Sequence, residues 1–583
     1  MLQSRVNVTC GLGGLALTAA LASSLGAQGA GKPLPIKYVG PATVPGITSG
    51  DLMTRLYKYS DDSMMGRDVG TPYHLKAVAY VESEVRRLGL KPGGTDGYYQ
   101  DFPIWQTSID PASTLTAGDA VFPIGNRFIA IGDETAKHIT NIPVIYGGMV
   151  TDTLTSLDSA AVAGKLLLLQ NGPRLSAEAQ QAVTQSEAYK AFRRALAGAA
   201  GTLNLQGDSL SPPLVKFYTS PSSTMKPPAT EGPQRAPILL VTTPVVEAIF
   251  GGPVSGLTKG QVGKPVTTDL RYTRAPGLPG RNVIAILPGS DPKLRGEYIA
   301  IGAHSDHVGF SKQLVAEHDS LKVFNTIGRP AGAEGGHPAP ITADEWTSIN
   351  AGIDSLRKIY PSRPDSIYNG ADDDGSGTVS VLEMAEAFAK GPVKPKRSIL
   401  FIWHAGEEHG MWGSGYFTDH PTVSRDSIVA EINIDMVGRG AATDVTGREK
   451  EGGVLHGADK YVQLVGSRRL STELGDLAAE VNKGKSYGFK FDYALDANGH
   501  PQNIYCRSDH AMYAAWGIPV VFFTTGGHAD YHQVTDEPQY IRYDHMANLD
   551  RMIFDLAVRV ADLDHRLVVD GKKMTDPHGA CQQ

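Results

Sequence analysis

The chain has 583 residues, of which 41% are hydrophobic and 20% are charged, a composition typical of globular protein and long enough for roughly two to four domains. Its formal net charge of -7 offers no basic surface of the kind that binds nucleic acid, and no block of like charges indicates a disordered tail. The composition therefore excludes nucleic-acid binding by charge and favours small molecules or peptides as substrates.

The N-terminus has the pattern of an export signal. Arg5 precedes an apolar stretch at 11–25, and small residues follow up to Ala30, which is the layout of a secretory signal peptide. About 15 apolar or small residues are fewer than the roughly 20 that a membrane-spanning helix needs, so no stable membrane span is expected. We expect residues 1–29 to be removed and the mature chain to be secreted or periplasmic.

Cysteines are few. Cys10 lies within the predicted signal, so the mature chain keeps only Cys506 and Cys581. At most one disulfide can therefore form, and stability must come from a buried core.

A helix and then a β-rich segment are predicted in the first half of the chain. The segment 74–94 ends in glycine and carries apolar residues at helical spacing, namely Leu75, Val78, Val81, Val85 and Leu88. Between 140 and 265 the pattern changes to short β-rich pieces and one alanine-rich helix, flanked by proline and glycine. We therefore predict a module inserted at 140–265 into a host domain made of 45–139 and 270–568.

Five nearly continuous apolar runs alternate with helical stretches in the second half. They are 281–289, 297–307, 398–408, 429–439 and 517–527. Continuous hydrophobicity predicts strands buried on both faces, so we expect an α/β fold with a mostly parallel central sheet between layers of helices. Active sites in such sheets lie beyond the carboxyl ends of the strands. Acids and histidines stand at three of these ends: His304, Asp306, Glu407, Glu408 and Asp435.

A polar segment at 310–368 interrupts this series. Thr342 and Glu345 have the spacing of a capping box, and a helical stripe follows, formed by Trp346, Ile349, Ile353, Leu356 and Ile359. The excursion is either a lid or part of a subunit interface, or an insertion without a role in function.

The segment NGADDDGSGTVSVLE at 369–383 allows two interpretations. Counted from Asp372, it satisfies the EF-hand template, with Glu383 at position twelve. Alternatively, a strand end runs into a helix and presents Asp373 to two metal ions. An EF-hand requires an entering helix, whereas residues 360–371 contain two prolines and a glycine and no apolar helical stripe, so we favour the second interpretation.

Seven motifs follow one another along the chain. They are GLKPGG (89–94), AHSDHVG (303–309), NGADDDGSG (369–377), AGEEHGMWGS (405–414), INIDMVGR (432–439), RSDHAMYAAWGIPV (507–520) and YHQVTDEP (531–538). In this order they resemble the motifs of the M28 metallopeptidases, the dizinc aminopeptidase group, with a protease-associated (PA) domain inserted. The resemblance covers most of the mature chain. It implies the zinc-exopeptidase fold, 140–265 as the PA domain, and two Zn²⁺ ions as cofactors.

Carried over residue by residue, the resemblance implies five metal ligands. His304 and Asp435 would bind one zinc ion, and Glu408 and His532 the other. Asp373 would bridge the two ions. Two neutral imidazoles and three carboxylates are a suitable set for such a pair.

Four further residues receive roles from the same resemblance. Glu407 falls on the general base and Tyr531 on the hydroxyl that helps to stabilise the oxyanion. Asp306 matches a carboxylate that orients a ligand histidine, and Arg507 matches a position that lines the amino-terminal pocket. Other histidines are expected to be structural or at most to line the site: His307, His404, His409, His420, His510 and His528.

These assignments imply a secreted exopeptidase that removes N-terminal residues from peptides, with a metal-bridged water and Glu407 as general base. A carboxypeptidase or a glutaminyl cyclase-like enzyme would keep the same fold and stays an alternative. Outside the enzymes, the alternative is a receptor-like binding protein without activity, against which the complete ligand set and Glu407 argue. No oligomeric state is predicted.

Overall fold

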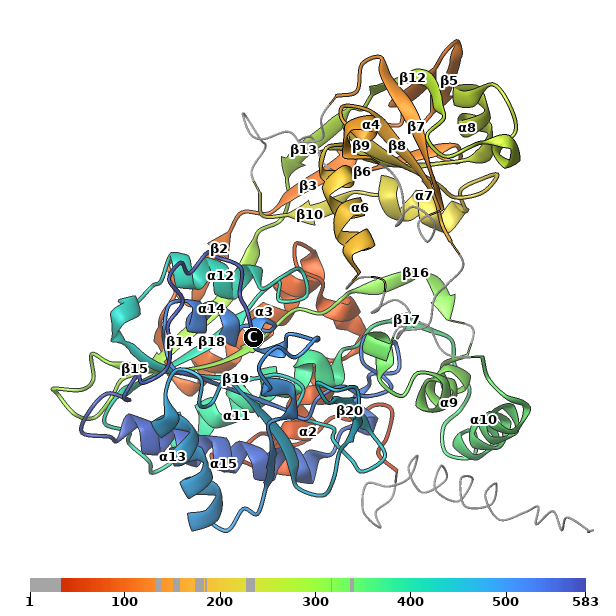
Figure 1. Cartoon of the computed structure of the whole chain (residues 1–583). Coiled ribbons are helices and arrows are strands. Elements are labelled where there is room, and N and C mark those ends of the chain that lie inside the picture. The colour runs from red at the N-terminus through yellow and green to blue at the C-terminus, as the bar shows by residue number, and fades with distance from the viewer. Residues whose placement is uncertain are drawn as a thin grey trace, which may run out of the picture. The chain divides into compact units, whose positions relative to one another are not determined.

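The computed structural model describes residues 33–132, 138–149, 158–172, 183, 186–226, 236–315, 317–335 and 340–583. The predicted signal at 1–29 lies outside these residues, and none of the helices they form is long and apolar enough to cross a membrane. The chain divides into two compact units (Figure 1), one of Met1–Phe102 with Pro279–Gln583 and one of Pro103–Leu278.

The larger unit is built on a nine-stranded sheet in the order β1-β14-β18-β15-β19-β24-β22-β23, with β2 paired to β14. Its strands are β1 (Lys91–Pro92), β2 (Tyr99–Phe102), β14 (Gly280–Leu287), β15 (Tyr298–His304), β18 (Ser398–His404), β19 (Ile428–Ile434), β22 (Tyr461–Val465), β23 (Lys490–Asp492) and β24 (Val520–Thr524). The inner strands β18, β15, β19 and β24 are parallel, which confirms the predicted parallel core. The run at 281–289 is an antiparallel strand, β14, because continuous hydrophobicity reports burial on both faces and not strand direction.

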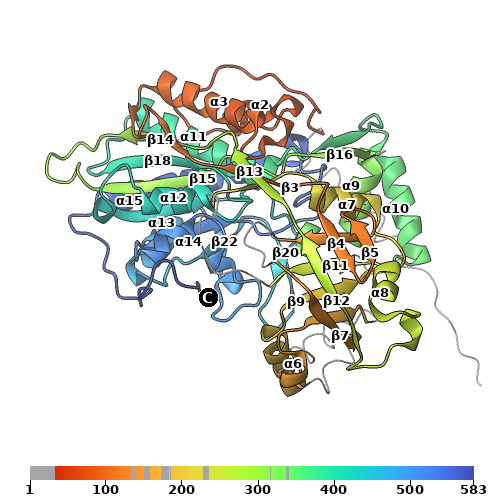
Figure 2. The ribbon, with the colours of Figure 1, turned by 90° about the horizontal axis from the view of Figure 1, so that it is seen from above.

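Helices cover both faces of this sheet (Figure 2), and successive side chains of a strand face opposite layers. Ile301 and Phe401 belong to the core on one face, whereas Ala300 and Ile402 belong to the core on the other. The first face is covered by α2 (Ser49–Tyr59), α3 (Pro72–Leu88), α11 (Gly377–Lys390), α13 (Thr472–Gly484) and α15 (Tyr543–Ala561). The second is covered by α12 (Trp412–Asp419) and α14 (His510–Ala515).

The predicted amphipathic helix is α3. Pro72 begins it, the Thr71 side chain caps it, and Gly89, at φ 75°, ends it. Val78 and Val81 are fully buried in the core, so the helical stripe faces the sheet as its spacing predicted.

The excursion at 310–368 forms two helices between the strands of a two-stranded antiparallel sheet: β16 (Phe310–Val315), α9 (His318–Gly328), α10 (Ala343–Leu356) and β17 (Asp365–Ile367). The capping box of Thr342 and Glu345 is present at the start of α10. Ile349 and Leu356 pack on Val323 of α9. Trp346 is 48% exposed, so it lies at the margin of the predicted stripe.

The EF-hand interpretation of 369–383 is wrong. The element before the acidic turn is the strand β17, and α11 begins only at Gly377. Glu383 does not close a calcium loop, because it accepts a hydrogen bond of 3.0 Å from Nε of the buried Arg55.

The smaller unit contains an eight-stranded sheet in the order β5-β4-β12-β7-β8-β9-β11-β6 and a three-stranded sheet in the order β10-β3-β13. Its strands are β3 (Trp105–Ile109), β4 (Thr114–Ala117), β5 (Ala120–Pro123), β6 (Phe128–Ile131), β7 (Ile142–Met149), β8 (Leu166–Gln170), β9 (Gly201–Leu205), β10 (Ser222–Thr224), β11 (Ile238–Val241), β12 (Val262–Asp269) and β13 (Tyr272–Pro276). Its helices are α4 (Ser159–Val162), α6 (Glu187–Ala197), α7 (Pro212–Thr219) and α8 (Thr243–Phe250). The unit begins at Pro103 rather than near 140, because β3 pairs with β13, β4 with β12 and β6 with β11. Its identity as a PA domain stays a prediction.

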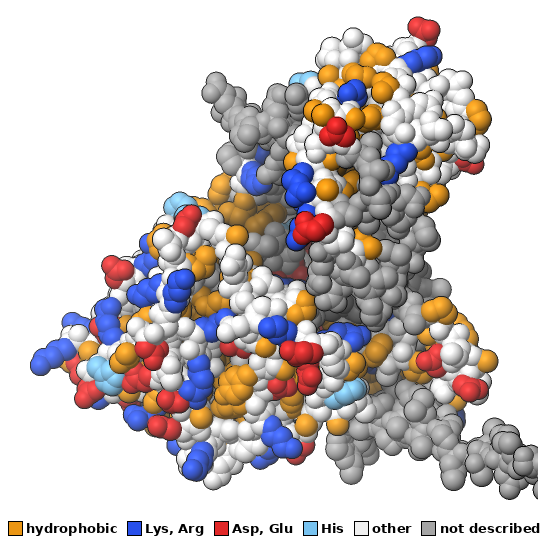
Figure 3. All heavy atoms as spheres, in the orientation of Figure 1, with side chains coloured by type: hydrophobic (Ala, Val, Ile, Leu, Met, Phe, Trp, Pro, Cys, Tyr) orange, Lys and Arg blue, Asp and Glu red, His pale blue; other side chains and the backbone are white. Residues whose placement is uncertain are grey.

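Cys506 and Cys581 form a disulfide, which is the one bond that the cysteine count allows. On the face shown in Figure 3, acidic and basic side chains are interspersed, in keeping with the small net charge.

Candidate metal centre

The predicted ligands come from loops at the carboxyl ends of the parallel strands. His304 is the last residue of β15, Asp435 directly follows β19, and Glu408 lies in the turn after β18. Asp373 comes from the turn before α11 and His532 from the loop after β24. Parallel strands bring these ends to one edge of the sheet, so segments far apart in sequence meet there.

Asp373 stands between two groups of side chains. Nε2 of His304 lies 3.1 Å from Oδ1 of Asp373 and 3.7 Å from Oδ1 of Asp435. On the other side, Nε2 of His532 lies 3.0 Å from Oδ2 of Asp373 and 2.9 Å from Oε2 of Glu408. Each carboxylate oxygen of Asp373 thus faces one group, which is the arrangement of a bridging ligand.

His307 joins the second group. Its Nδ1 lies 2.7 Å from Oε1 of Glu408 and 3.6 Å from Oδ2 of Asp373, and the side chain is fully buried. From the sequence, His307 was expected to be structural or at most to line the site. The one signal in the sequence was its place next to Asp306 beyond the end of a strand.

These residues fit a pair of metal ions. The ligand atoms of each group lie within 4.8 Å of one another, so one ion per group can be reached by all its members. Among the described residues, Nε2 of His304, Oδ1 of Asp435 and Nε2 of His532 are buried and make no hydrogen bond. Buried polar atoms without a partner are rare, whereas imidazole nitrogens and carboxylate oxygens are the ligands that zinc takes.

When no metal ion is bound, the imidazoles of His304 and His532 have raised pKa values and keep their protons at neutral pH. Burial opposes the charged form of His532, but the carboxylates of Glu408 and Asp373, at 2.9 Å and 3.0 Å from its Nε2, outweigh burial and raise its pKa to about 11. Burial is likewise outweighed at His304, where the charge of Asp435 and the other neighbouring carboxylates raise the pKa well above its usual range. Metal ions must therefore displace protons from both histidines.

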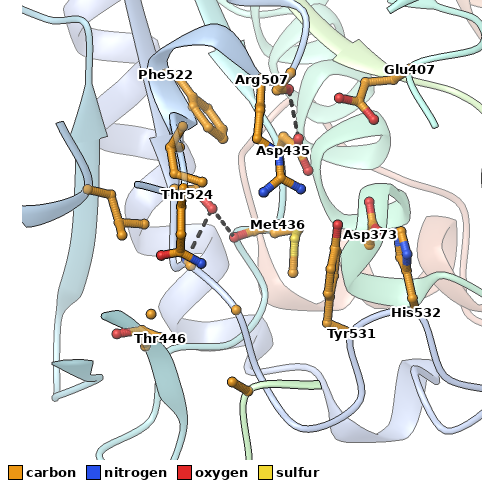
Figure 4. Close-up of a pocket in the computed structure, with 18 of the residues that line it drawn as sticks. Asp373, Glu407, Asp435, Met436, Thr446, Arg507, Phe522, Thr524, Tyr531 and His532 are labelled. Atoms are coloured by element: carbon orange, nitrogen blue, oxygen red, sulfur yellow. Dashed lines mark hydrogen bonds and ion pairs between the residues drawn. The ribbon is translucent and has the colours of Figure 1, made fainter. Parts of the chain in front are cut away.

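Glu407 and Tyr531 line the cavity beside the two groups (Figure 4). Burial raises the pKa of Glu407 well above its usual range, and repulsion from Glu408 and Asp435 adds to the effect. Burial and the nearby carboxylate of Asp373 also raise the pKa of Tyr531, so its hydroxyl stays protonated. A high-pKa carboxyl group beside a hydroxyl donor is suitable for proton transfer, and both roles stay predictions.

Asp306 contacts the backbone more closely than it contacts His304. Its Oδ1 accepts hydrogen bonds from the N–H groups of Gly406 at 2.7 Å and Glu407 at 3.1 Å, but lies 3.7 Å from Nδ1 of His304. That nitrogen is 3.2 Å from the backbone carbonyl of Asp306. In this structure the Asp306 carboxylate shapes the turn that carries Glu407 and Glu408.

Ser508 contacts the predicted ligand Asp435, which the sequence did not indicate. Its hydroxyl donates a hydrogen bond of 2.7 Å to Oδ2 of Asp435 and accepts one of 2.9 Å from the Asn433 side chain. These bonds orient the carboxylate of Asp435, as the surroundings of a metal site usually do. Its neighbour Arg507 lines the cavity, and its place in an amino-terminal pocket stays a prediction.

The cavity beside the predicted ligands has a volume of about 520 Å³, within the size range of small-molecule sites. Much of its wall is apolar, formed by Val445, Leu495, Ile504 and Phe522. This wall, in the same cavity as Asp373, would accommodate an apolar side chain.

The excursion at 310–368 holds the loop that carries Tyr531 and His532. The buried Lys322 of α9 forms an ion pair with the buried Asp530. The N–H of Ala333 donates a hydrogen bond of 3.2 Å to the carbonyl of Tyr531. A Cβ at Gly332 would come within 2.9 Å of the Cβ of Tyr531, so the two backbones pack closely. These contacts do not distinguish a lid from a subunit interface, but they show that the segment packs on the loop of Tyr531 and His532.

A third group of possible ligands lies at the base of the excursion, formed by His318, Asp365 and Glu537. The guanidinium of Arg363 already pairs with both carboxylates, with Nη1 at 3.1 Å from Oδ2 of Asp365. This group is therefore an ion-pair cluster in which a cation of the protein already contacts both carboxylates.

Comparison with known proteins identifies relatives of the segment that holds this site. Residues 282–557 match the sequence profile of Peptidase family M28. Leucine aminopeptidase 1 of Pyrenophora tritici-repentis (strain Pt-1C-BFP) is 28% identical over 233 residues, covering 38% of this chain and 54% of that protein. Leucine aminopeptidase 1 of Paracoccidioides brasiliensis (strain Pb03) is 29% identical over 233 residues, with the same coverages. The chain thus spans about half the length of the curated relatives it matches.

Among solved structures, the aminopeptidase from Aneurinibacillus sp. strain AM-1 is similar with a TM-score of 0.45 and 17% identity, covering 90% of this chain and 97% of that chain. The M28 match at 282–557 includes all five predicted ligands.

Proposed function

We propose that the chain is a dizinc exopeptidase of peptidase family M28, whose profile residues 282–557 match, and that it removes residues from the amino ends of peptides. The observation that carries the proposal is the position of Asp373, whose two oxygens face separate groups of candidate ligands. A cavity with an apolar wall and Glu407 lies directly beside them, as hydrolysis of a bound peptide requires.

The proposed roles follow from these positions. His304 and Asp435 would hold one zinc ion, Glu408 and His532 the other, and Asp373 both. The ions, when bound, would polarise the scissile carbonyl and lower the pKa of water. Glu407 would accept the proton of the attacking water and deliver it to the leaving amine.

Two further groups of the chain would act on the substrate. The hydroxyl of Tyr531, kept protonated by its raised pKa, would donate a hydrogen bond to the developing oxyanion. The wall that contains Leu495 and Phe522 would take up the side chain of the terminal residue.

The experiment is a comparison of peptides with blocked ends. Purified protein loaded with two equivalents of zinc is incubated with one peptide in three forms: free, acetylated at the amino end, and amidated at the carboxyl end. We expect stepwise release from the amino end of the free and amidated forms and none from the acetylated form. Absence of hydrolysis of all three would contradict the proposal.

A carboxypeptidase is the second candidate, and one observation favours it. Arg448 and Arg507 both line the cavity, where a guanidinium could bind the terminal carboxylate of a substrate. Hydrolysis of the acetylated peptide together with resistance of the amidated one would select this reaction.

We further propose that the chain is exported and that the unit Pro103–Leu278 is the PA domain implied by the resemblance. Intact-mass measurement of the product exported from a bacterial host tests the first part. Shortening near residues 26–30 is expected, and an unshortened chain retained in the membrane fraction would contradict export.

A further inference from the structure

We infer that His307 is a direct ligand of the second metal position, through Nδ1, so that this position is held by His307, Asp373, Glu408 and His532. The inference rests on the proposed dizinc function. It adds a third histidine to the site, so that the two metal positions differ in their number of protein ligands.

The distances support a single coordination shell. Around zinc, bonds of about 2.0–2.1 Å in a tetrahedron place ligand atoms roughly 3.3 Å apart. Nδ1 of His307 lies 3.6 Å from Oδ2 of Asp373, and Nε2 of His532 lies 3.0 Å from the same oxygen. The carboxylate of Glu408 reaches both rings, at 2.7 Å from Nδ1 of His307 and 2.9 Å from Nε2 of His532.

The imidazole of His307 is held in place by a built pocket. A Cβ at Gly370 would come within 2.5 Å of ring atoms of His307, and Gly370 has a φ of +54°, which favours glycine. The buried Arg67 fixes this turn by donating hydrogen bonds to the carbonyls of Asn369 at 2.6 Å and Gly370 at 2.8 Å. A ring fixed this firmly beside Glu408 is suited to coordination, which demands a defined direction of the lone pair.

The two positions would then differ in their ligand sets. The first group offers His304, Asp435 and the shared Asp373, and three protein ligands leave a coordination site open, as in catalytic zinc centres. The second group offers four residues and approaches a closed site. We therefore expect the second position to bind zinc more tightly and to fill first.

The alternative is that His307 only donates a hydrogen bond to Glu408 and orients it. His307→Asn separates the two roles, because the amide nitrogen of asparagine can occupy the place of Nδ1 and still donate to Glu408 but is a poor zinc ligand. The matched control is His409→Asn, since His409 lies two residues beyond Glu407, is exposed, and bonds to Asp68 at 2.9 Å.

The primary readout is zinc affinity, measured by chelator competition on the full chain. For His307→Asn we expect the tighter of the two equivalents to weaken by at least about 100-fold, while His409→Asn stays within a few fold of the wild type. Two equivalents bound by His307→Asn as tightly as by the wild type would overturn the inference.

A second measurement uses the wild-type protein and does not depend on the folding of a variant. In the cobalt-substituted protein, each ligating histidine contributes one solvent-exchangeable, hyperfine-shifted imidazole N–H signal in the proton NMR spectrum. We expect three such signals, from His304, His307 and His532. Two signals with two cobalt ions bound would overturn the role of His307 and leave the proposed function intact, whereas fewer than two ions bound would contradict the proposed function itself.

Discussion

Replacing Lys322 by methionine should loosen the loop that carries Tyr531 and His532. The substitution keeps the apolar stem and removes the charge that pairs with Asp530. Both side chains of the pair are buried, so Asp530 would lose one of its cationic partners inside the protein. Asp530 directly precedes Tyr531 in the chain, so losing this ion pair should loosen the backbone at Tyr531.

The free energy lost on substitution depends on the partners that Asp530 keeps. Removing one partner of a buried pair costs about 3–5 kcal/mol when the other charge is left alone. Here Nη1 of Arg439 stays 2.9 Å from Oδ2 of Asp530, and the Thr535 hydroxyl donates to Oδ1 at 2.8 Å. We therefore expect a smaller loss, about 2 kcal/mol, which corresponds to a roughly 30-fold rise in the open population of the loop.

Amide hydrogen exchange of residues 528–533 and zinc affinity are the two assays. Exchange in this loop should accelerate by roughly 30-fold, and the zinc equivalent held by His532 should weaken, while exchange in the central strands stays unchanged. Lys358→Met is the matched control, because Lys358 is an exposed lysine of the same excursion. If Lys322→Met behaved like Lys358→Met in both assays, the excursion would not support the site in the way we describe.

Three other predictions concern the metal centre. Glu407→Gln should keep both zinc ions but lose about 10²–10⁴ in rate, whereas Glu408→Gln should lower zinc content; the reverse pattern of zinc content, measured by mass spectrometry, would refute the assignment of base and ligand. Asp373→Asn should abolish hydrolysis and reduce zinc binding, while Glu383→Gln keeps turnover within a few fold; an Asp373→Asn variant that stays active and binds two zinc ions would contradict the bridging role of Asp373. Because the pKa of His532 is raised to about 11 in the metal-free site, zinc binding should release protons at pH 7 and strengthen as the pH rises; calorimetric enthalpies that do not depend on the ionisation enthalpy of the buffer would contradict this.

The sequence predicted the parts of this structure that rest on local pattern. Continuous apolar runs located the buried strands, and the acids and histidines at their ends located the site. The direction of the strand at 281–289 could not be predicted, because an antiparallel strand buried on both faces has the same hydrophobic pattern as a buried parallel strand. The start of the smaller unit at Pro103 was missed for a related reason, since it depends on pairing between β3 and β13, which are far apart in sequence.

The sequence also could not predict which side chains from different loops contact one another. The five ligands came from the resemblance, but nothing in the sequence showed that His307 lies 2.7 Å from Glu408 or that Lys322 is buried against Asp530. Such contacts join elements from different parts of the chain, and no periodicity of the sequence encodes them.

Anomalous diffraction at the zinc absorption edge, from crystals of the zinc-loaded protein, would show directly whether Asp373 bridges two ions. We expect two peaks roughly 3.5–4 Å apart, one on each side of the Asp373 carboxylate. A single peak, or two peaks of which neither contacts Asp373, would contradict it.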